Sequence, residues 1–445
     1  MRKTILAALA ISATLAASAE GYQINTLSAK QNGMGHTGTA LKLGAESMIF
    51  NPAGMGYMDK SMDISGSFTA IFPSAKVTLQ DGKTYESTNT ASTPLAAGAA
   101  FSIYDNLKAG VTFYTPYGSG IDWTENWPGA VLNQKVNLKT FTIQPTVAWR
   151  ITPKLSVGAG LMLTWGSVDL SKGLVSAQSM DIMMQSMGSD YRFGLTTPAS
   201  VNLQGTTSIA AGFNVGAMYD IDSHWSVGAS FRSQMKMKVK AGDAYLAYAN
   251  DIAQQLLQNQ LDVINQANFK AEMPCPWVLN MGASYRPVEK LTLAFDAQLT
   301  GWKAYKTLDI EFLDPKLTSY DQHLTKDYHN SWTFHLGGEY ALTDRFDIRA
   351  GLMVDTTPVN KDYYNPETPG MTKIEPSVGF SFRPIRNLSI DASVLYVAGL
   401  GRDNASCTYT DLLLTTMTGK PVTSTFTGDY KASAVVPSIG INYSF

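Results

Sequence analysis

Two polar stretches of the sequence carry apolar side chains at helical spacing. In residues 171–203, four methionines recur at i, i+3, i+4 and i+7, on one face of a short helix: Met180, Met183, Met184 and Met187. In residues 240–275, a second stripe contains Tyr245, Ala249, Ile252 and Leu256. Such stripes either pack on each other or form an adaptable, greasy groove for a hydrocarbon chain, for which methionine is well suited. The candidate ligand-binding residues are Met180, Met183, Met184, Met187, Tyr245, Ile252 and Leu256.

Residue patterns for covalent or metal chemistry are weak. The five histidines, at positions 36, 224, 323, 329 and 335, form neither an HExxH motif nor a paired metal spacing. No GxSxG, P-loop or CxxC motif is present. We therefore predict no enzyme, no metal and no cofactor, and keep a Ser-His lipid hydrolase as an alternative, because its residues would meet only in space. Cys275 and Cys407 permit one disulfide, and the sequence leaves their pairing open.

The elements that would position these residues are β-strands. The chain has 445 residues, of which 16% are charged, well below the roughly 25% of a typical soluble domain. Its 34 basic and 36 acidic residues nearly balance, which argues against nucleic acid as a partner. Apolar and polar residues alternate with period two in many segments, including 155–165, 291–300, 346–355, 374–383 and 388–396. This alternation predicts strands with one apolar and one wet face.

Three details favour a membrane barrel over a soluble sandwich. The alternating segments are long enough to cross a bilayer at a tilt. Their polar faces carry mixed charges and glycines, as a lumen would. Tryptophans fall on the apolar face near strand ends, where an aromatic girdle belongs: Trp149, Trp165, Trp225, Trp277 and Trp332.

The strand count follows from the connections. Six short turns and seven longer polar loops make thirteen connections between fourteen strands. Bacterial single-chain barrels have even strand numbers, with short periplasmic turns and long outer loops. The last strand ends at Phe445 with Ile439, Ile441 and Tyr443 on its apolar face. Such an aromatic C-terminal strand is typical of proteins recognised by the barrel insertion machinery.

The N-terminal residues do not follow the alternation. Residues 1–19 have a basic start, a short apolar core and an Ala17-Ser-Ala19 cleavage site, so we predict a signal peptide. Residues 20–58 are rich in glycine and hold apolar residues that a solvated tail would not need. A 14-stranded lumen is too wide for its own side chains to fill. We therefore predict an all-β fold in which residues 59–445 form a 14-stranded antiparallel transmembrane β-barrel, plugged by a small hatch, residues 20–58.

Several motifs resemble those of one family. They are Glu20-Gly-Tyr-Gln-Ile-Asn25, Gly33-Met-Gly35, Asn51-Pro52-Ala53, Thr115-Pro-Tyr-Gly118, Leu299-Thr-Gly-Trp-Lys303, Asp355-Thr-Thr-Pro-Val359 and Ile441-Asn-Tyr-Ser-Phe445. The chain resembles, over its whole mature length, the OMPP1/FadL/TodX family of outer-membrane transporters for long-chain fatty acids and other hydrophobic compounds.

The resemblance implies a mechanism and residues for it. Outer loops would capture the ligand, hatch movement would open the wall at a kink in the third strand, and the ligand would leave sideways into the bilayer. The residues implied are Gly21, Tyr22, Asn51, Pro52 and Ala53 for the hatch gate, Pro116, Tyr117 and Gly118 for the kink, and Lys172 and Lys326 for a ligand carboxylate.

The resemblance also implies a location and partners. We expect a passive monomer in the outer membrane of a Gram-negative bacterium, in contact with outer-membrane lipid and with a hydrophobic small molecule. The alternative function is a general diffusion porin for hydrophilic solutes, which would need no hatch. Inside the lumen we expect Arg150, Arg349 and Arg383 to pair with Asp347, Glu375 and Asp391.

Overall fold

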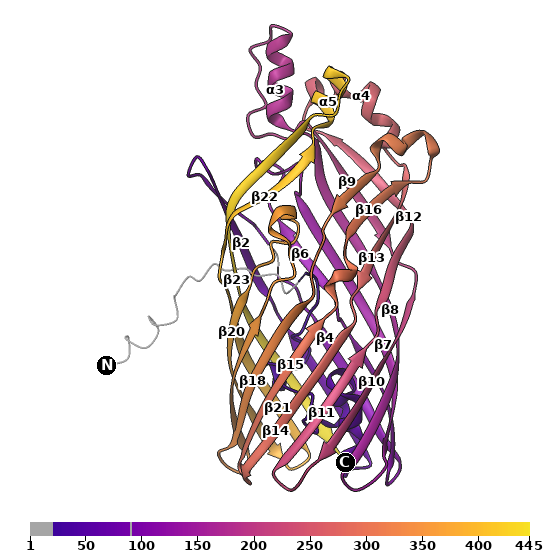
Figure 1. The fold of residues 1–445 in the computed structure, drawn as a ribbon, viewed down its shortest axis with the longest axis vertical. Helices are drawn as coiled ribbons and strands as arrows, with labels where there is room; N and C mark the ends of the chain where they lie inside the picture. Colours follow the sequence, from indigo (N-terminus) through magenta and orange to yellow (C-terminus); the bar gives the residue numbers. More distant parts are fainter. Residues whose placement is uncertain (1–20, 90) are drawn as a thin grey trace, which may run out of the picture.

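The chain folds into one closed antiparallel barrel of 14 strands (Figure 1). The computed structural model describes residues 21–89 and 91–445, so the predicted signal peptide, residues 1–19, lies outside the described residues. Strand β1 pairs with β23 and closes the ring, from Asp63–Ser444 to Thr69–Ser438. The predicted strand number and antiparallel order are confirmed.

The lower ring consists of fourteen strands, each paired with its two neighbours. In order around the ring they are β1 (Met62–Thr69), β4 (Leu95–Tyr104), β5 (Leu107–Tyr114), β7 (Lys135–Arg150), β8 (Leu155–Val175), β10 (Ala210–Asp220), β11 (Trp225–Arg232), β14 (Val278–Val288), β15 (Leu291–Thr300), β18 (Ser331–Ala341), β19 (Phe346–Asp355), β20 (Lys373–Ile385), β21 (Leu388–Gly399) and β23 (Thr423–Ser444). Short hairpin turns join these strands at the end where the C-terminus lies (Figure 1).

Shorter strands extend the wall at the opposite end. They are β2 (Phe72–Leu79), β3 (Thr84–Glu86), β6 (Gly118–Asp122), β9 (Ala199–Thr206), β12 (Met235–Tyr248), β13 (Asn268–Cys275), β16 (Thr307–Phe312), β17 (Gln322–Thr325) and β22 (Arg402–Thr410). Most continue a lower strand after a short break, as β12 continues β11.

The helices are short and lie either within the N-terminal segment or on the long loops. The first group is α1 (Ala29–Asn32), η1 (Gly44–Glu46), α2 (Ser47–Phe50) and η2 (Pro52–Tyr57). The second group is α3 (Ala177–Ser186), α4 (Asp251–Leu261), η3 (Asp262–Ile264), η4 (Trp302–Ala304), η5 (Pro315–Tyr320), η6 (Lys361–Tyr363) and α5 (Leu412–Thr418). Among the described residues, no helix is long and apolar enough to cross a membrane.

The two faces of the wall exchange character along the strands. In the lower part of β8, Leu161 is exposed on the outside while Thr164 is buried inside. Higher on the same strand, Asp169 lies on the outer face and Leu170 is buried inside. Strand β12 shows the same upper pattern, with Lys238 outside and Val239 inside. The lower wall therefore suits a hydrocarbon exterior and a polar lumen, whereas the upper wall suits water outside and encloses an apolar lumen.

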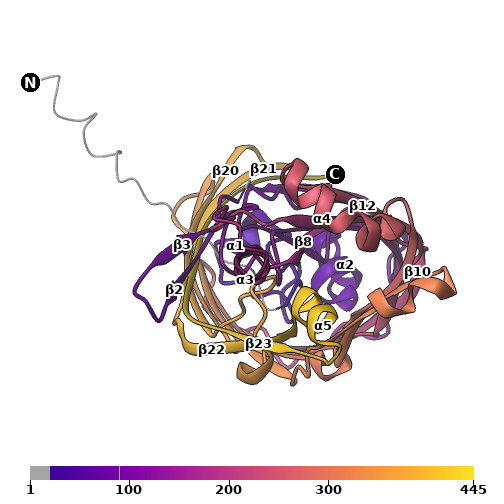
Figure 2. The same cartoon turned by 90° about the horizontal axis from the view of Figure 1, so that it is seen from above.

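Residues 21–58 lie inside the ring (Figure 2). Their backbone bonds directly to wall side chains: Ala29 N donates to Ser67 Oγ at 2.8 Å, and Gly38 N donates to an Asp296 carboxylate oxygen at 2.7 Å. Residues 21–58, which we call the hatch, thus occupy the lower lumen and are bonded to its wall. The hatch corresponds to the predicted segment 20–58 without Glu20, which lies outside the described residues.

Paired glycines let the hatch backbone approach the wall. Gly337 and Gly351 face each other on β18 and β19, and a Cβ atom on either would overlap the hatch backbone at residues 34–35. Gly158 and Gly216 are paired in the same way on β8 and β10, under Asn51-Pro52. These lumen glycines therefore form a docking surface for the hatch. The sequence had predicted only that they lie on the polar, lumen-facing side of the strands.

A charged network joins the hatch to the wall near the C-terminal strands. Arg349 lies at its centre, 3.2 Å from Asp391 and 2.7 Å from Glu339, and Arg383 pairs with Asp347. Lys30 of the hatch reaches Glu339 at 3.7 Å. The expected pairs of Arg349 and Arg383 are thus present.

Two expected members of this network lie elsewhere. Arg150 donates to the carbonyl of Pro153 and lies over the Tyr57 ring, because it is at the short-turn end of β7, outside the lumen network. Glu375 is buried beside Lys373 and Asp355, and it pairs with no arginine in the part of the chain that the structure describes. Those two pairing predictions were wrong.

The C-terminal strand presents its aromatic end on the outside. Tyr443 and Phe445 contact each other with ring centroids 5.3 Å apart, and both are exposed. Recognition of this end by the barrel insertion machinery remains a prediction.

Candidate functional site

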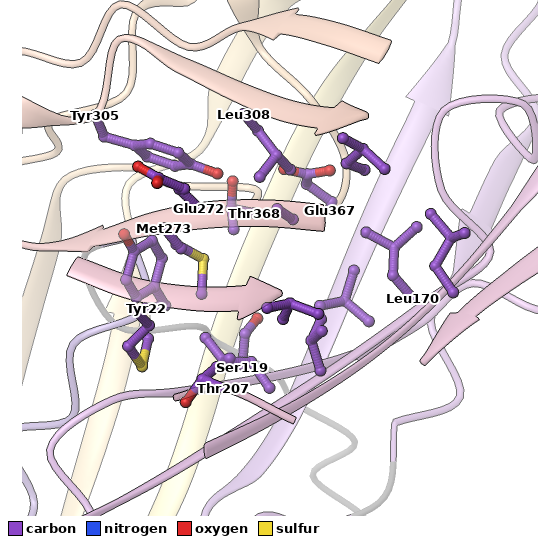
Figure 3. Close-up of a pocket in the computed structure, with 18 of the residues that line it drawn as sticks. Tyr22, Ser119, Leu170, Thr207, Glu272, Met273, Tyr305, Leu308, Glu367 and Thr368 are labelled. Atoms are coloured by element: carbon purple, nitrogen blue, oxygen red, sulfur yellow. The ribbon is translucent and has the colours of Figure 1, made fainter. Parts of the chain in front are cut away.

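An apolar cavity occupies the upper lumen, between strands β7, β8, β9, β12, β13 and β16 (Figure 3). The cavity is narrow, with a volume of about 80 Å³. Aliphatic, methionine and phenylalanine side chains form most of its lining: Val136, Leu138, Val168, Leu170, Leu203, Met237, Val239, Phe269, Ala271, Met273, Leu308 and Ile310. Each comes from the inner face of a strand whose outer face is polar. The cavity suits a hydrocarbon ligand, because such pockets are mostly apolar with few polar groups.

The charged groups at the cavity already have partners. Glu272 pairs with Lys236 at 2.8 Å on the outer face. Glu367 forms an ion pair with Lys326, whose side chain is almost fully buried. Hydroxyls of Ser119, Tyr305 and Thr368 also reach the lining. The lining therefore offers hydrogen bonds to a ligand head without an unpaired charge against its tail.

The third wall strand is interrupted beside this cavity. Strand β5 ends at Tyr114, and β6 resumes at Gly118 with a register shifted by one residue against β7. Between β5 and β6, the Thr140 side chain takes the place of backbone hydrogen bonds to β7. Its hydroxyl donates to the Tyr117 carbonyl at 2.6 Å and accepts from the Tyr117 amide at 3.0 Å. Proline at 116 cannot donate to a ladder. The third strand is thus broken into β5 and β6 at Pro116 and Tyr117, two of the three residues named for the kink.

The break leaves an edge toward the preceding strand. Among the described residues, the backbone bonds from this edge stop at Thr115 N to Leu95 O and resume at Thr88 N to Asp122 O. The hatch fills the space between. Ile24 N donates to Pro116 O at 2.9 Å, and Gly118 N donates to Tyr22 O at 2.8 Å, with Gln23 and Tyr117 paired between them. Residues 22–24 therefore act as a short extra strand that closes the wall at the kink.

Tyr22 belongs to both the closure and the cavity. Its ring packs against Trp302 and Tyr305 at centroid distances of 4.9 and 5.7 Å, and its hydroxyl donates to the Pro274 carbonyl. It also lines the cavity with Ser119 (Figure 3). Gly21 lies against the face of the Trp302 ring at a φ of +52°, where any Cβ would overlap the ring. Tyr22 therefore lines the cavity and also closes the wall.

The two lysines proposed for a carboxylate lie at the rim. Lys172 follows Leu170 on the inner face of β8, and its Nζ is 3.3 Å from Gln322 Oε1. Lys326 is held by Glu367 and lies 6.0 Å from the Tyr305 ring centroid. Nearby, Tyr328 bonds with Thr368 at 2.9 Å, and burial raises the pKa of Tyr328 well above its ordinary value. Of these two lysines, Lys172 is the one without an ion pair to a carboxylate among the described residues.

The loop methionines form a core of their own. Met180 and Met184 are buried on α3 and pack in one cluster with Leu257 of α4 and Leu413 of α5. Met183 and Leu256 lie partly buried at its edge, whereas Met187 and Ile252 are exposed. None of these residues lines the cavity. The packing alternative thus accounts for most of the methionine face, and ligand contact there remains a proposal.

One residue of the second stripe is not helical. Tyr245 lies on β12, which extends to Tyr248, and α4 begins only at Asp251. The prediction that Tyr245 lies on a helix was wrong. Apolar residues recur at about every fourth position through the end of β12 and the start of α4, so the spacing alone did not separate the strand from the helix. The exposed ring of Tyr245 is on the outer face, away from the cavity.

An open groove between the loop helices was missed by the sequence analysis. It lies between α4, η5 and α5, and its apolar lining comes from Leu261, Val263, Leu317, Tyr320 and Leu412. These residues are spread over three loops, so no single periodic stripe marks them. The groove is a candidate entry surface above the barrel.

The Asn51-Pro52-Ala53 motif lies at the opposite end of the hatch. Asn51 is fully buried; its Nδ2 donates to Thr39 O at 2.7 Å and to Ala217 O at 3.0 Å, and its Oδ1 accepts from Ala53 N. The motif begins η2 and fastens the lower hatch to β10. It therefore anchors the hatch far from the kink, while Gly21 and Tyr22 lie at the kink itself.

The two cysteines do not form a disulfide. Cys275 is buried, Cys407 is half-buried, and both are free.

Comparisons with known proteins show which proteins the chain is similar to. Residues 10–445 match the model of a family described as outer membrane protein transport protein (OMPP1/FadL/TodX). A long-chain fatty acid transport protein of Escherichia coli O6:H1 is 22% identical over 415 residues, which cover 89% of this chain and 91% of that protein. A putative outer membrane protein of Neisseria meningitidis is 24% identical over 424 residues, covering 89% of this chain and 90% of that protein.

Solved structures share the fold. A Pseudomonas aeruginosa FadL homologue superposes with a TM-score of 0.78 at 18% identity, covering 96% of this chain and 100% of that one. The toluene transporter TodX of Pseudomonas putida gives 0.67 at 14% identity, covering 97% and 99%. At these identities the likeness concerns the fold alone.

Proposed function

The chain belongs to the OMPP1/FadL/TodX family of outer membrane transport proteins, and from this premise we propose that it takes up long-chain fatty acids passively and releases them sideways. The ligand is captured at the loop groove, moves into the apolar cavity and leaves through the wall at the kink when the hatch residues 22–24 withdraw. The observation that carries the proposal is the hatch strand that closes the broken wall beside the cavity.

The energetics support binding without an energy source. Each methylene removed from water contributes about 0.8 kcal/mol, so ten contribute roughly 8 kcal/mol. Ordering of the ligand and desolvation of its head reduce this gain. Transfer from the cavity into bilayer hydrocarbon is close to neutral for the tail, because both surroundings are apolar. The bilayer is therefore an accessible destination once the wall opens.

Fatty acids are the proposed substrate class for two reasons. The fatty acid transport protein of Escherichia coli aligns with this chain over most of both lengths. In addition, Lys172 lies at the rim, and within residues 21–89 and 91–445 its side-chain partner is the neutral Gln322, so a carboxylate there would gain a charge-assisted hydrogen bond. Lys326 serves the rim less directly, since Glu367 already neutralises it.

Leu170→Asp is expected to weaken oleate binding at least about tenfold. The aspartate would place an unpaired carboxylate in the apolar cavity and hold water that the hydrocarbon tail must displace. The matched control is Ser171→Asp. Ser171 is the next residue of β8 and lies on the outer face of the strand, so the same charge is added outside the cavity. Binding to purified protein is measured by fluorescence displacement, and uptake of radiolabelled oleate is measured in a deletion strain complemented with each variant.

The outcomes separate the site from the substrate. Equal loss in both variants, or no loss in either, would contradict the cavity as the binding site. Wild-type protein that binds toluene but not oleate would remove fatty acids while keeping a hydrophobic ligand. Wild-type protein that binds neither would contradict the transport proposal.

A further inference from the structure

A row of hydroxyl and lysine side chains crosses the outer face of the upper wall. The register aligns Lys139 with Ser167, and Ser167 with Thr206. Because Thr207 pairs with Val239, Thr206 lies opposite Lys240. These residues come from strands β7, β8, β9 and β12, which lie side by side (Figure 1). At the strand spacing of a sheet, Lys139 and Lys240 are roughly 14 Å apart along the row.

The row continues onto β13 and β16. A bulge in β12 turns both Lys240 and Ala241 outward, opposite Lys270. Lys270 is paired with Glu311 at 2.7 Å. Lys139 and Lys240 are both exposed, and within the described chain neither has an ion pair or hydrogen bond from its ammonium group. Two uncompensated positive charges therefore stand beside a compensated one.

An aromatic cluster lies beneath the Lys139 end of the row. Phe113, Phe141 and Trp165 contact one another on the outer face, with centroid distances of 5.8 to 6.4 Å. Aromatic girdles mark the boundary between hydrocarbon and headgroups. Lys139 and Ser167 lie two residues above Phe141 and Trp165, about 7 Å along the strands. Lys139 and Ser167 therefore lie at headgroup height in the leaflet on the side of the long loops, and the row continues from them along the wall.

We propose that this row binds the phosphorylated headgroup of an outer-leaflet glycolipid, that is, lipopolysaccharide. Ammonium groups attract phosphate, and the hydroxyls of Ser167 and Thr206 supply hydrogen bonds between the two lysines. A basic patch immediately outside the hydrocarbon is the arrangement that anionic lipid headgroups favour. The proposal concerns the lipid around the barrel and is independent of the transported ligand.

The test compares lipid retained by purified barrels. The double variant Lys139→Gln with Lys240→Gln is expected to retain at least about tenfold less lipopolysaccharide per barrel, because each lysine contributes roughly fivefold at an anionic surface. The matched control, Lys60→Gln with Lys290→Gln, removes two exposed lysines at the short-turn end and is expected to retain the wild-type amount. Mass spectrometry of the lipid in mild detergent gives the readout, and heat-modifiable gel mobility reports folding.

Two further variants keep the test decisive. Replacing both lysines with arginine keeps the charge and is expected to keep the lipid. Glu311→Gln frees Lys270 and is expected to increase lipid retention, a gain that misfolding would not produce. Wild-type retention in the folded glutamine variant would overturn the proposal. So would inorganic phosphate raising the melting temperature in detergent as much as lipopolysaccharide of equal phosphate content.

Discussion

Gly351→Leu is expected to convert the closed barrel into an ion-conducting one. A Cβ at position 351 would overlap the backbone of Met34 and Gly35, and neither backbone can rotate away as a flexible side chain would. The hatch must shift, which removes the bonds from Gly35 N to Ser377 and from His335 to Gly35 O. A 14-stranded lumen without its plug holds water, so planar bilayers containing the variant should show stable open channels, whereas wild-type protein should be nearly silent.

The matched control for this prediction faces lipid. Gly66→Leu adds the same side chain on the outer face of β1, where the one described residue within 4 Å of a Cβ is Ile441, at 3.6 Å. It should leave the barrel closed and its heat-modifiable mobility unchanged. Large wild-type conductance would instead favour the diffusion-porin alternative. A silent, folded Gly351→Leu barrel would mean that the hatch tolerates the displacement.

A disulfide between residues 23 and 117 is expected to reduce fatty acid uptake to background. Gln23 and Tyr117 form an antiparallel pair flanked by the bonds Ile24 N–Pro116 O and Gly118 N–Tyr22 O. The Cα atoms of such a non-hydrogen-bonded pair are about 4.5 Å apart, within disulfide reach. Gln23→Cys with Tyr117→Cys would therefore fasten the hatch strand to the kink, and the wall could not open. Uptake of radiolabelled oleate is compared in oxidised and reduced cells.

The reduced form of the same variant is the control, since it carries the loss of both original side chains. Both native cysteines are replaced with alanine, because buried Cys275 lies near Tyr22. Each single-cysteine variant should transport equally under both redox conditions. Oxidised double-cysteine cells that take up oleate as fast as reduced cells would show that release does not require the hatch strand to leave.

The strand framework was accessible from sequence because the alternation is local. The apolar and polar residues within each strand show which side faces lipid, and each short turn is marked by its own turn residues. The count of fourteen strands therefore needed no knowledge of long-range contacts. The hatch contacts were not accessible in this way. Asn51 bonds to Ala217, and Ile24 bonds to Pro116, across separations that no periodic pattern encodes.

The cavity had a signal in the sequence that period-two analysis did not use. Above Trp165, β8 carries Ser167 and Asp169 on its outer face and Val168 and Leu170 on its inner face, the reverse of its lower half. Strand β12, which lies in the upper wall, likewise has Lys236 and Lys238 on its outer face and Met237 and Val239 on its inner face. A change of apolar face along one strand marks the height at which the wall leaves the bilayer and encloses an apolar lumen. The loop methionines indicated a ligand groove in the sequence, but the apolar faces of helices from three loops pack against one another and bury most of them.

Photo-cross-linking tests most directly whether the apolar cavity behind the hatch is the ligand path. A fatty acid analogue with a diazirine on its alkyl tail is irradiated with purified protein, and the modified peptides are mapped by mass spectrometry. We expect adducts on cavity residues such as Leu170, Leu203 and Val239, and their loss when excess oleate competes. Adducts confined to the lipid-facing wall, such as Val215 and Leu336, or insensitive to oleate, would contradict the account.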